Sequence, residues 1–230
     1  MTIKDFGNFT QMNDQLILKF PTHQAYKKED FYVSPSNQEA YDFINSWPKW
    51  IKRIINIFGP PGSGKSHLAS ILKNKTSCLS INSNDLDEKT FLKFKTREAL
   101  IIENLDEKIS EKLLFSLWNI ALQDNKYFLI TSRKPINSYK FKLSDLVSRI
   151  NSSLIVGINL PSDDLISVIL TKNFSDRQIK VEKKHIDYII KRIDRSYEKI
   201  SQFILTLDKY SLKKGSPFSL KLIKEVLKMM

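Results

Sequence analysis

The chain lacks several features, and each absence narrows the classes of protein to which it can belong. Its 230 residues contain one cysteine, Cys78, so no internal disulfide can form. No run of about 18 apolar residues occurs, so the sequence predicts no membrane span. The N-terminus has no apolar signal-peptide core, and we find no internal repeat or low-complexity tract. These absences favour a cytoplasmic protein. The length allows either one good-sized domain or one domain with a small appendage.

Arginine is also scarce. Of the 37 basic residues only 7 are arginine, and the rest are lysine. A net charge of +12 is typical of nucleic-acid binding. Here it is spread along the chain and accompanies many Ile and Asn residues, so compositional drift towards Lys, Ile and Asn is favoured over a dedicated DNA-binding surface. Since this chain uses lysine where a plain positive charge suffices, each arginine is a candidate for a role that needs a planar, forked guanidinium.

One stretch has a specific chemical meaning. Residues 59–66 read Gly-Pro-Pro-Gly-Ser-Gly-Lys-Ser, a complete G-x-x-x-x-G-K-[ST] phosphate-binding loop. Its glycines let backbone N–H groups converge on a phosphate. Lys65 can reach the β- and γ-phosphates, and the Ser66 hydroxyl can ligate Mg²⁺. A buried strand is predicted at 53–58 and a helix from 67 to 73, which places the loop at a helix N-terminus, where phosphate is favoured.

Strand and helix patterns alternate through the first two thirds of the chain. The predicted strands are 53–58, 77–81, 99–103, 127–131 and 154–158, with helical patterns between them. Such alternation predicts an α/β fold, a parallel sheet covered by helices. After Pro161 the pattern is helical throughout. We therefore predict a flexible N-terminal segment over residues 1–25, an α/β domain over 26–161 and a helical domain over 162–230.

Polar residues follow two of the predicted strands. Glu103-Asn104 ends an apolar run, and in P-loop ATPases such a strand end holds Mg²⁺ and a water-activating carboxylate. Asn104 cannot act as a base, so we expect slow self-catalysed hydrolysis; the alternative is a buried strand with a solvated Glu. Asp106-Glu107 is a poorer register for the same role. Residues 131–133 either face the γ-phosphate or form an ordinary polar strand end.

Two arginines and one peptide are further candidates. Arg149, on a short amphipathic helix, is either a surface charge or an arginine finger for a neighbouring molecule's transferring phosphate. Arg195, at the start of a helix of the helical domain, either reaches back to a nucleotide or is solvated. Residues 15–20, Gln-Leu-Ile-Leu-Lys-Phe, form an outer strand, which the pattern alone favours, or a peptide that docks into a partner's pockets.

Taken together, these residues resemble the AAA+ family, and within it the DnaA/Hda group. The similarity runs from about Gln15 to the C-terminus. It rests on four groups of residues: Phe31-Tyr32-Val33 with Asn37 and Ala40; the phosphate-binding loop with His67 after it; residues 143–149; and residues 176–178 with 193–196. It implies an AAA+ P-loop NTPase core with a five-stranded parallel sheet, followed by a small all-α lid, which is the helical domain.

The resemblance also implies roles for individual residues. Arg149 would be an arginine finger acting in trans, Glu103 a Walker B-like acid, and Ser66 with Glu103 the Mg²⁺ ligands. The sliding clamp would be bound by Gln15, Leu16, Leu18 and Phe20, although the Lys19-Phe20 ending departs from the commoner form. ATP or ADP would be bound by Gly59, Pro60, Pro61, Gly62, Ser63, Gly64, Lys65, Ser66, His67 and, as the sensor 2 residue, Arg195.

Within the group, residues 176–178 with 193–196 resemble the lid of Hda-like regulators of α-proteobacterial type. The resemblance is to these regulators and not to a full initiator, because the chain is expected to end after the lid without a helix-turn-helix DNA-binding domain. Such proteins, bound to the clamp on DNA, stimulate ATP hydrolysis on DnaA and so limit re-initiation. The implied partners are DnaA, the β sliding clamp and, through the clamp, DNA, with no membrane; a homodimer stays open. The alternatives are a self-contained AAA+ ATPase or loader that uses Lys65 and Glu103, and a DnaA-like DNA-binding protein.

Overall fold

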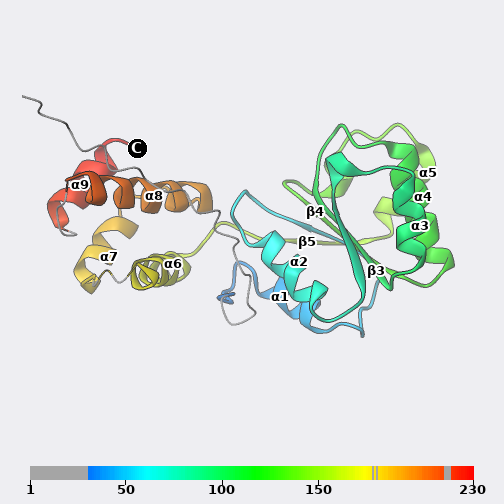
Figure 1. Cartoon of the computed structure of the whole chain (residues 1–230), viewed down its shortest axis with the longest axis horizontal. Helices are drawn as coiled ribbons and strands as arrows, with labels where there is room; N and C mark the ends of the chain where they lie inside the picture. Colours follow the sequence, from blue (N-terminus) through cyan, green and yellow to red (C-terminus); the bar gives the residue numbers. More distant parts are fainter. Residues whose placement is uncertain (1–30, 178, 180, 215–218) are drawn as a thin grey trace, which may run out of the picture.

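The computed structural model describes residues 31–177, 179, 181–214 and 219–230. Five parallel strands form one sheet in the order β2-β3-β4-β1-β5 (Figure 1). This confirms the predicted α/β class and the five-stranded parallel sheet. The strands are β1 (Ile54–Phe58), β2 (Cys78–Asn82), β3 (Ala99–Leu105), β4 (Tyr127–Ser132) and β5 (Leu154–Gly157).

Helices cover both faces of the sheet, so its central strands are nearly all apolar. In Figure 1 the first two helices lie on one side of the sheet and the next three on the other. Alternate strand residues enter two separate cores: Ile55 and Ile57 pack with the first two helices, whereas Ile54 packs with the other three. These helices are α1 (Gln38–Asn45), α2 (Lys65–Lys73), α3 (Lys89–Lys95), α4 (Glu111–Gln123) and α5 (Ser144–Asn151), with short turns η2 (Ser83–Asp85) and η3 (Ile136–Ser138).

The last part of the chain is helical and has a hydrophobic core of its own. The side chain of Ser162 accepts a hydrogen bond from the N–H of Leu165, which caps the first of these helices. The helices are α6 (Asp163–Asp176), α7 (Lys183–Ile190), α8 (Tyr197–Lys214) and α9 (Leu220–Lys228). Figure 1 shows them grouped beyond one end of the α/β layers.

The order of the strands decides where a ligand can bind. Strand β1 lies between β4 and β5, so the chain must cross the sheet from β1 to β2 at its far edge. In open parallel sheets, ligands bind outside the carboxyl ends of the strands where the order reverses. The loop after β1 and the ends of β3 and β4 therefore belong to one edge. Within the described ranges, no helix has the length and apolarity to cross a membrane.

A buried side-chain amide in β1 holds the strand ends together at this edge of the sheet. Asn56 is 1% exposed, and its side-chain amide donates to the carbonyl of Ile130 and to Ser132 Oγ at 3.1 and 2.8 Å. Its Oδ1 accepts from the N–H of Ile136 at 2.9 Å. Asn56 thus joins the loop strand to the end of β4 and to the turn that follows.

We expect Asn56→Ala to lower the free energy of unfolding by about 2–4 kcal/mol, because it leaves buried partners unpaired and a small void. Urea denaturation checks this. The exposed Asn151 on α5 provides a matched control, whose alanine variant should change stability by no more than about 0.5 kcal/mol. A loss below about 1 kcal/mol for Asn56→Ala would contradict the assigned role.

Candidate nucleotide-binding site

The loop between β1 and α2 has a backbone that only glycine adopts without strain. Gly62 and Gly64 have φ values of +77° and +93°. A Cβ at Gly64 would lie 2.8 Å from the Phe31 ring, and one at Gly59 would lie 2.9 Å from the carbonyl oxygen of Ile158. The glycines therefore provide both the conformation and the close approach that the motif predicts.

Lys65 is the buried cation of this loop. Its side chain is folded over the loop, with 8% of the residue exposed, and Nζ donates to the carbonyls of Gly59 and Pro60 at 2.8 Å each. Burial, together with the nearby charge of Arg133, lowers the pKa of Lys65 to about 8. The ammonium is thus a poorly solvated charge that gains from an anion.

This pKa predicts that nucleotide binding weakens at alkaline pH. The phosphates need the charged amine, which the free protein loses as pH rises through about 8. The affinity should therefore be nearly constant below pH 7 and about tenfold lower at pH 9, with a proton taken up on binding. Calorimetry of ADP binding at pH 7 and 9, in two buffers of different ionisation enthalpy, measures both quantities. Equal affinity at the two pH values would contradict the assignment.

A cavity of about 220 Å³ lies over the loop and brings together three strand ends. Its lining contains residues 61–67, Asn104 from β3 and Arg133 from just after β4. Arg133, the exposed residue that follows β4, adds a second positive charge beside Lys65. The fold therefore brings the loop together with the ends of β3 and β4. Two cations beside converging N–H groups can hold a phosphate chain.

Asn104 enters this cavity through a local irregularity of β3. Its φ is +57°, and the pairing of β3 with β4 shifts register between Ile102 and Leu105. The backbone N–H of Asn104 donates to Thr131 Oγ1 at 3.1 Å, and its carbonyl accepts from Ser83 Oγ at 2.7 Å. Strand β3 therefore continues two residues beyond its expected end at Glu103. An amide, which cannot take a proton from water, lies beside the phosphate cavity.

Glu103 lies in a cluster of donors from three elements. Its Oε1 accepts from Lys73 Nζ and from Ser80 Oγ, at 3.0 Å each, and the Ser66 hydroxyl also hydrogen-bonds the carboxylate. Burial by itself raises the pKa of Glu103, but the hydrogen bonds from Lys73 and Ser66 and the charge of Lys73 outweigh it and lower the pKa overall. A hydroxyl beside an ionised carboxylate is an oxygen set that fits Mg²⁺.

A second cavity, of about 350 Å³, continues from the first towards the helical domain. Both cavities are lined by Ser63, Gly64 and His67. The further lining is largely apolar and comes from both parts of the chain: Phe31, Tyr32, Asn37, Leu165, Val168, Ile169, Lys172, Asn173, Asp176 and Tyr197. A cavity with aromatic and aliphatic walls and a few polar groups, joined to a phosphate cavity, suits a nucleoside phosphate.

The wall of this second cavity is fixed by aromatic and amide contacts. The Phe31 ring stacks on Tyr41 with a centroid distance of 5.5 Å and meets His67 edge to face at 5.2 Å. Asn37 donates to the carbonyl of Tyr32 and accepts from the N–H of Ser34. Sequence reasoning missed Tyr197 and Leu165, because only the folded chain brings the helical domain to the loop.

Arg195 occupies a different place from the expected one. Its guanidinium pairs with both carboxylate oxygens of Asp163 at 2.9 and 3.0 Å, at the start of α6. Arg195 is not among the described residues that line either cavity. Its role as a nucleotide contact therefore stays a prediction that would require this ion pair to open.

Arg149 lies in a hollow of its own on the surface of α5. This hollow of about 310 Å³ is lined by Phe115, Asp145, Ser148, Arg149 and Ser152. Among the described residues, the linings of the two cavities near the loop do not include Arg149. A guanidinium displayed away from the chain's own loop, beside a hollow, can meet a group of another molecule.

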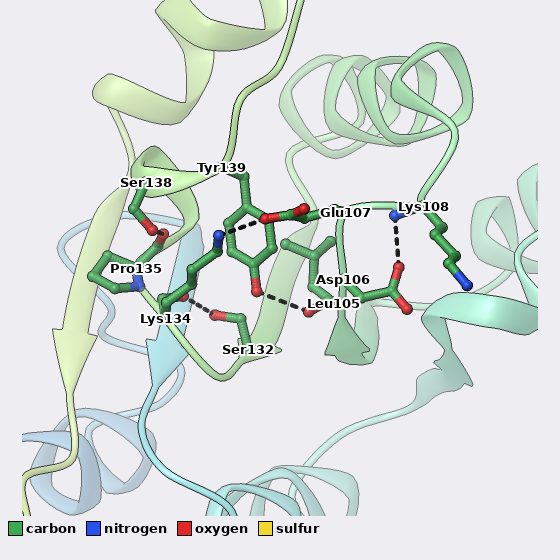
Figure 2. A network of polar contacts seen from close by, with 9 residues as sticks. All are labelled: Leu105, Asp106, Glu107, Lys108, Ser132, Lys134, Pro135, Ser138 and Tyr139. Atoms are coloured by element: carbon green, nitrogen blue, oxygen red, sulfur yellow. Dashed lines mark hydrogen bonds and ion pairs between the residues drawn. The ribbon is translucent and has the colours of Figure 1, made fainter.

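Fixed contacts connect the strand ends to α5. Figure 2 shows Lys134 beside Glu107, at 2.6 Å, and the Tyr139 hydroxyl donating to the carbonyl of Leu105 at 3.0 Å. The Glu111 carboxylate then accepts from the N–H groups of residues 142 and 143 at 2.9 and 2.8 Å, directly before α5. The loops after β3 and β4 and the start of α5 are thus held together. The predicted clamp peptide, residues 15–20, lies outside the described residues.

Comparison with known proteins finds relatives of similar sequence and solved structures of similar fold. No protein-family model matches the chain. The replication initiator DnaA of Campylobacter jejuni (serotype O:6) is 26% identical over 231 aligned positions, covering 89% of this chain and 52% of the relative. DnaA of Borreliella afzelii is 26% identical over 214 positions, covering 81% and 44%. The chain thus spans about half the length of the curated relatives it matches.

The solved structures agree in fold. Domain III of DnaA from Thermotoga maritima superposes with a TM-score of 0.73 at 20% identity, covering 91% of this chain and 98% of that one. AMPPCP-bound DnaA from Aquifex aeolicus gives 0.66 at 19% identity, covering 80% and 65%. The RuvB branch migration motor of T. maritima gives 0.57 at 17% identity, covering 77% and 61%. In sequence the chain is thus similar to about half of the replication initiator DnaA, and it shares the AAA+ fold of domain III of DnaA.

Proposed function

We propose that the chain is a regulatory, nucleotide-binding AAA+ protein that stimulates ATP hydrolysis on DnaA and so limits re-initiation of replication. It does so together with the DNA-loaded sliding clamp, in the role of an Hda-like protein of the cytoplasm. One observation carries the proposal: the chain displays Arg149 away from its own phosphate loop, whereas that loop faces Asn104 instead of a base. This division favours chemistry on a partner's nucleotide.

The chain's own site binds ATP or ADP in this proposal. DnaA structures with AMPPCP support an adenine nucleotide, since the fold is shared. The phosphates lie on the loop against Lys65 and Arg133, and the base enters the aromatic cavity beside Phe31. Ser66 and Glu103 would hold Mg²⁺, which neutralises phosphate charge when bound. With Asn104 at the base position, the bound nucleotide serves to order the body and the helical domain, and intrinsic hydrolysis is slow.

Arg149 acts on DnaA as an arginine finger. Its guanidinium approaches the γ-phosphate of ATP bound to DnaA and stabilises the charge that develops on the transferring group. The Glu111 carboxylate accepts hydrogen bonds from the two residues directly before α5, which anchors the start of the helix that carries the arginine. Rigid presentation matters because catalytic groups lose effect when displaced by about 1 Å.

The alternative is a self-contained ATPase or loader, and the contact of Ser66, next to Lys65, with Glu103 favours it. The steady-state rate of ATP hydrolysis separates the two. We expect turnover near background for the chain alone, and clear turnover when DnaA and DNA-loaded clamp are added. Hydrolysis by the chain alone that depends on Lys65 and Glu103 would support the self-contained ATPase and refute the regulatory role.

The clamp tether makes a separate prediction. Replacing Gln15 and Leu18 together with alanine should remove binding to the β clamp, because the two side chains are the proposed anchors of residues 15–20. Surface plasmon resonance on immobilised clamp measures this, and Lys19→Ala is the matched control within the peptide. Clamp binding that persists in the double variant would show that residues 15–20 do not bind the clamp through these side chains.

A further inference from the structure

The acid at the candidate Mg²⁺ position already has a cation beside it. Glu103 Oε1 lies 3.0 Å from the ammonium of Lys73. Lys73 is the last residue of α2 and lies seven positions after Ser66, about two helical turns away on the same face. Its long side chain reaches Glu103, which the Ser66 hydroxyl also contacts. The ion pair is thus connected to the phosphate loop through Ser66.

Burial makes this pair stronger than an ordinary surface ion pair. The Glu103 side chain is 17% exposed and that of Lys73 is 37% exposed. Solvent and salt screen such a pair less than a fully exposed one. Ser80 Oγ, on the neighbouring strand β2, donates to the same carboxylate oxygen and holds it in place. The carboxylate therefore keeps its partner in the folded chain without a metal ion.

These contacts determine how much negative charge of the protein a bound nucleotide would meet. An unpaired carboxylate beside a polyphosphate repels it, and in P-loop proteins Mg²⁺ removes that repulsion. Here Lys73 already neutralises Glu103, and the phosphate side has Lys65 and Arg133. Most of the charge that a divalent cation would compensate is thus already compensated by side chains.

We propose that Lys73 is a built-in counter-cation that takes over part of the charge role of Mg²⁺, so that this chain binds its nucleotide with little dependence on the metal. The inference rests on the proposed nucleotide site and specifies how that site is regulated. A nucleotide held in this way stays bound when Mg²⁺ varies, as suits a ligand that maintains the structure of a regulator.

Binding of a fluorescent ADP analogue, with Mg²⁺ or with EDTA, tests the inference. We expect the wild-type affinity to differ by less than about threefold between the two buffers. Lys73→Met exposes the charge of Glu103 to the phosphates, so metal-free binding should weaken by about tenfold while binding with Mg²⁺ changes little. The same substitution at Lys112, exposed on α4, is the matched control and should leave both affinities unchanged.

A second variant separates the charge effect from damage to the fold. Adding Glu103→Gln to Lys73→Met removes both charges and should restore metal-free binding, which a merely structural lysine would not allow. Glu103→Gln alone should bind metal-free ADP more tightly than the wild type does. Circular dichroism melting checks that each variant is folded.

Three outcomes would overturn the inference. The first is a wild-type affinity for the ADP analogue that falls about a hundredfold in EDTA. The second is a Lys73→Met variant that binds the analogue as the wild type does in both buffers. The third is no binding of the analogue by the wild type in either buffer. Stimulation of DnaA is read separately. If metal-independent binding is found without stimulation, the regulatory proposal fails and this inference stands.

Discussion

Arg149→Ala is expected to reduce stimulation of ATP hydrolysis on DnaA by about a thousandfold or more, the range in which arginine fingers act. Binding of ADP by the variant should stay at the wild-type level, because Arg149 is not among the described residues that line the two cavities near the loop. The measurement is the rate of phosphate release from DnaA in the presence of DNA-loaded clamp and either form of the chain.

Two further variants make the Arg149 result specific. Arg149→Lys keeps the charge but not the planar fork, so it should recover little of the stimulation. Arg97→Ala removes an exposed arginine that contacts Ser77 near the start of β3, and it should stimulate as the wild type does. Stimulation by Arg149→Ala within about threefold of the wild type would refute the arginine-finger role, since a true finger contributes orders of magnitude.

Lys65→Ala is expected to weaken ADP binding by about a hundredfold or more. The substitution removes a buried, charge-assisted donor to the phosphates, and each such bond contributes about 1.5–3 kcal/mol. It also leaves the carbonyls of Gly59 and Pro60 without the ammonium that they now accept from. Isothermal titration calorimetry measures the change, with Lys112→Ala as an exposed control on α4.

Because the proposed nucleotide orders the body, Lys65→Ala should also lose the rise in melting temperature that ADP gives the wild type. An affinity within about fivefold of the wild type would mean that the loop does not hold phosphate in the manner described.

The sheet and its loop could be predicted from sequence because their signals are local. Short apolar runs separated by helical patterns gave five strands, and the observed ends differ from the predicted ones by at most two residues. The error at β3 has a definite cause. Asn104 adopts a left-handed conformation at a register shift, and no alternation of apolar residues reports that. Asparagine tolerates this conformation better than most residues, so an asparagine at this position was the signal in the sequence that could have indicated the irregularity.

The remaining parts of the site depend on contacts between distant segments. Lys73 meets Glu103 only because folding brings the end of α2 to β3, and Tyr197 reaches the loop only because the helical domain lies beside it. Arg195 pairs with Asp163 in the folded chain, a contact between distant segments that the sequence pattern does not report, and its role at the nucleotide stays a prediction. Asn56 was visible in the sequence as a single amide inside a buried strand, and that was a usable signal of a positioning residue.

A single-turnover experiment tests the central claim, that the relevant chemistry occurs on the partner's nucleotide. DnaA is loaded with radiolabelled ATP, freed of excess nucleotide, and mixed with DNA-loaded clamp and with this chain carrying unlabelled ADP. Only hydrolysis on DnaA releases the label. We predict that the chain speeds release of labelled phosphate by at least about a thousandfold, and that Arg149→Ala removes the effect. Release at the same rate with and without the chain would contradict it.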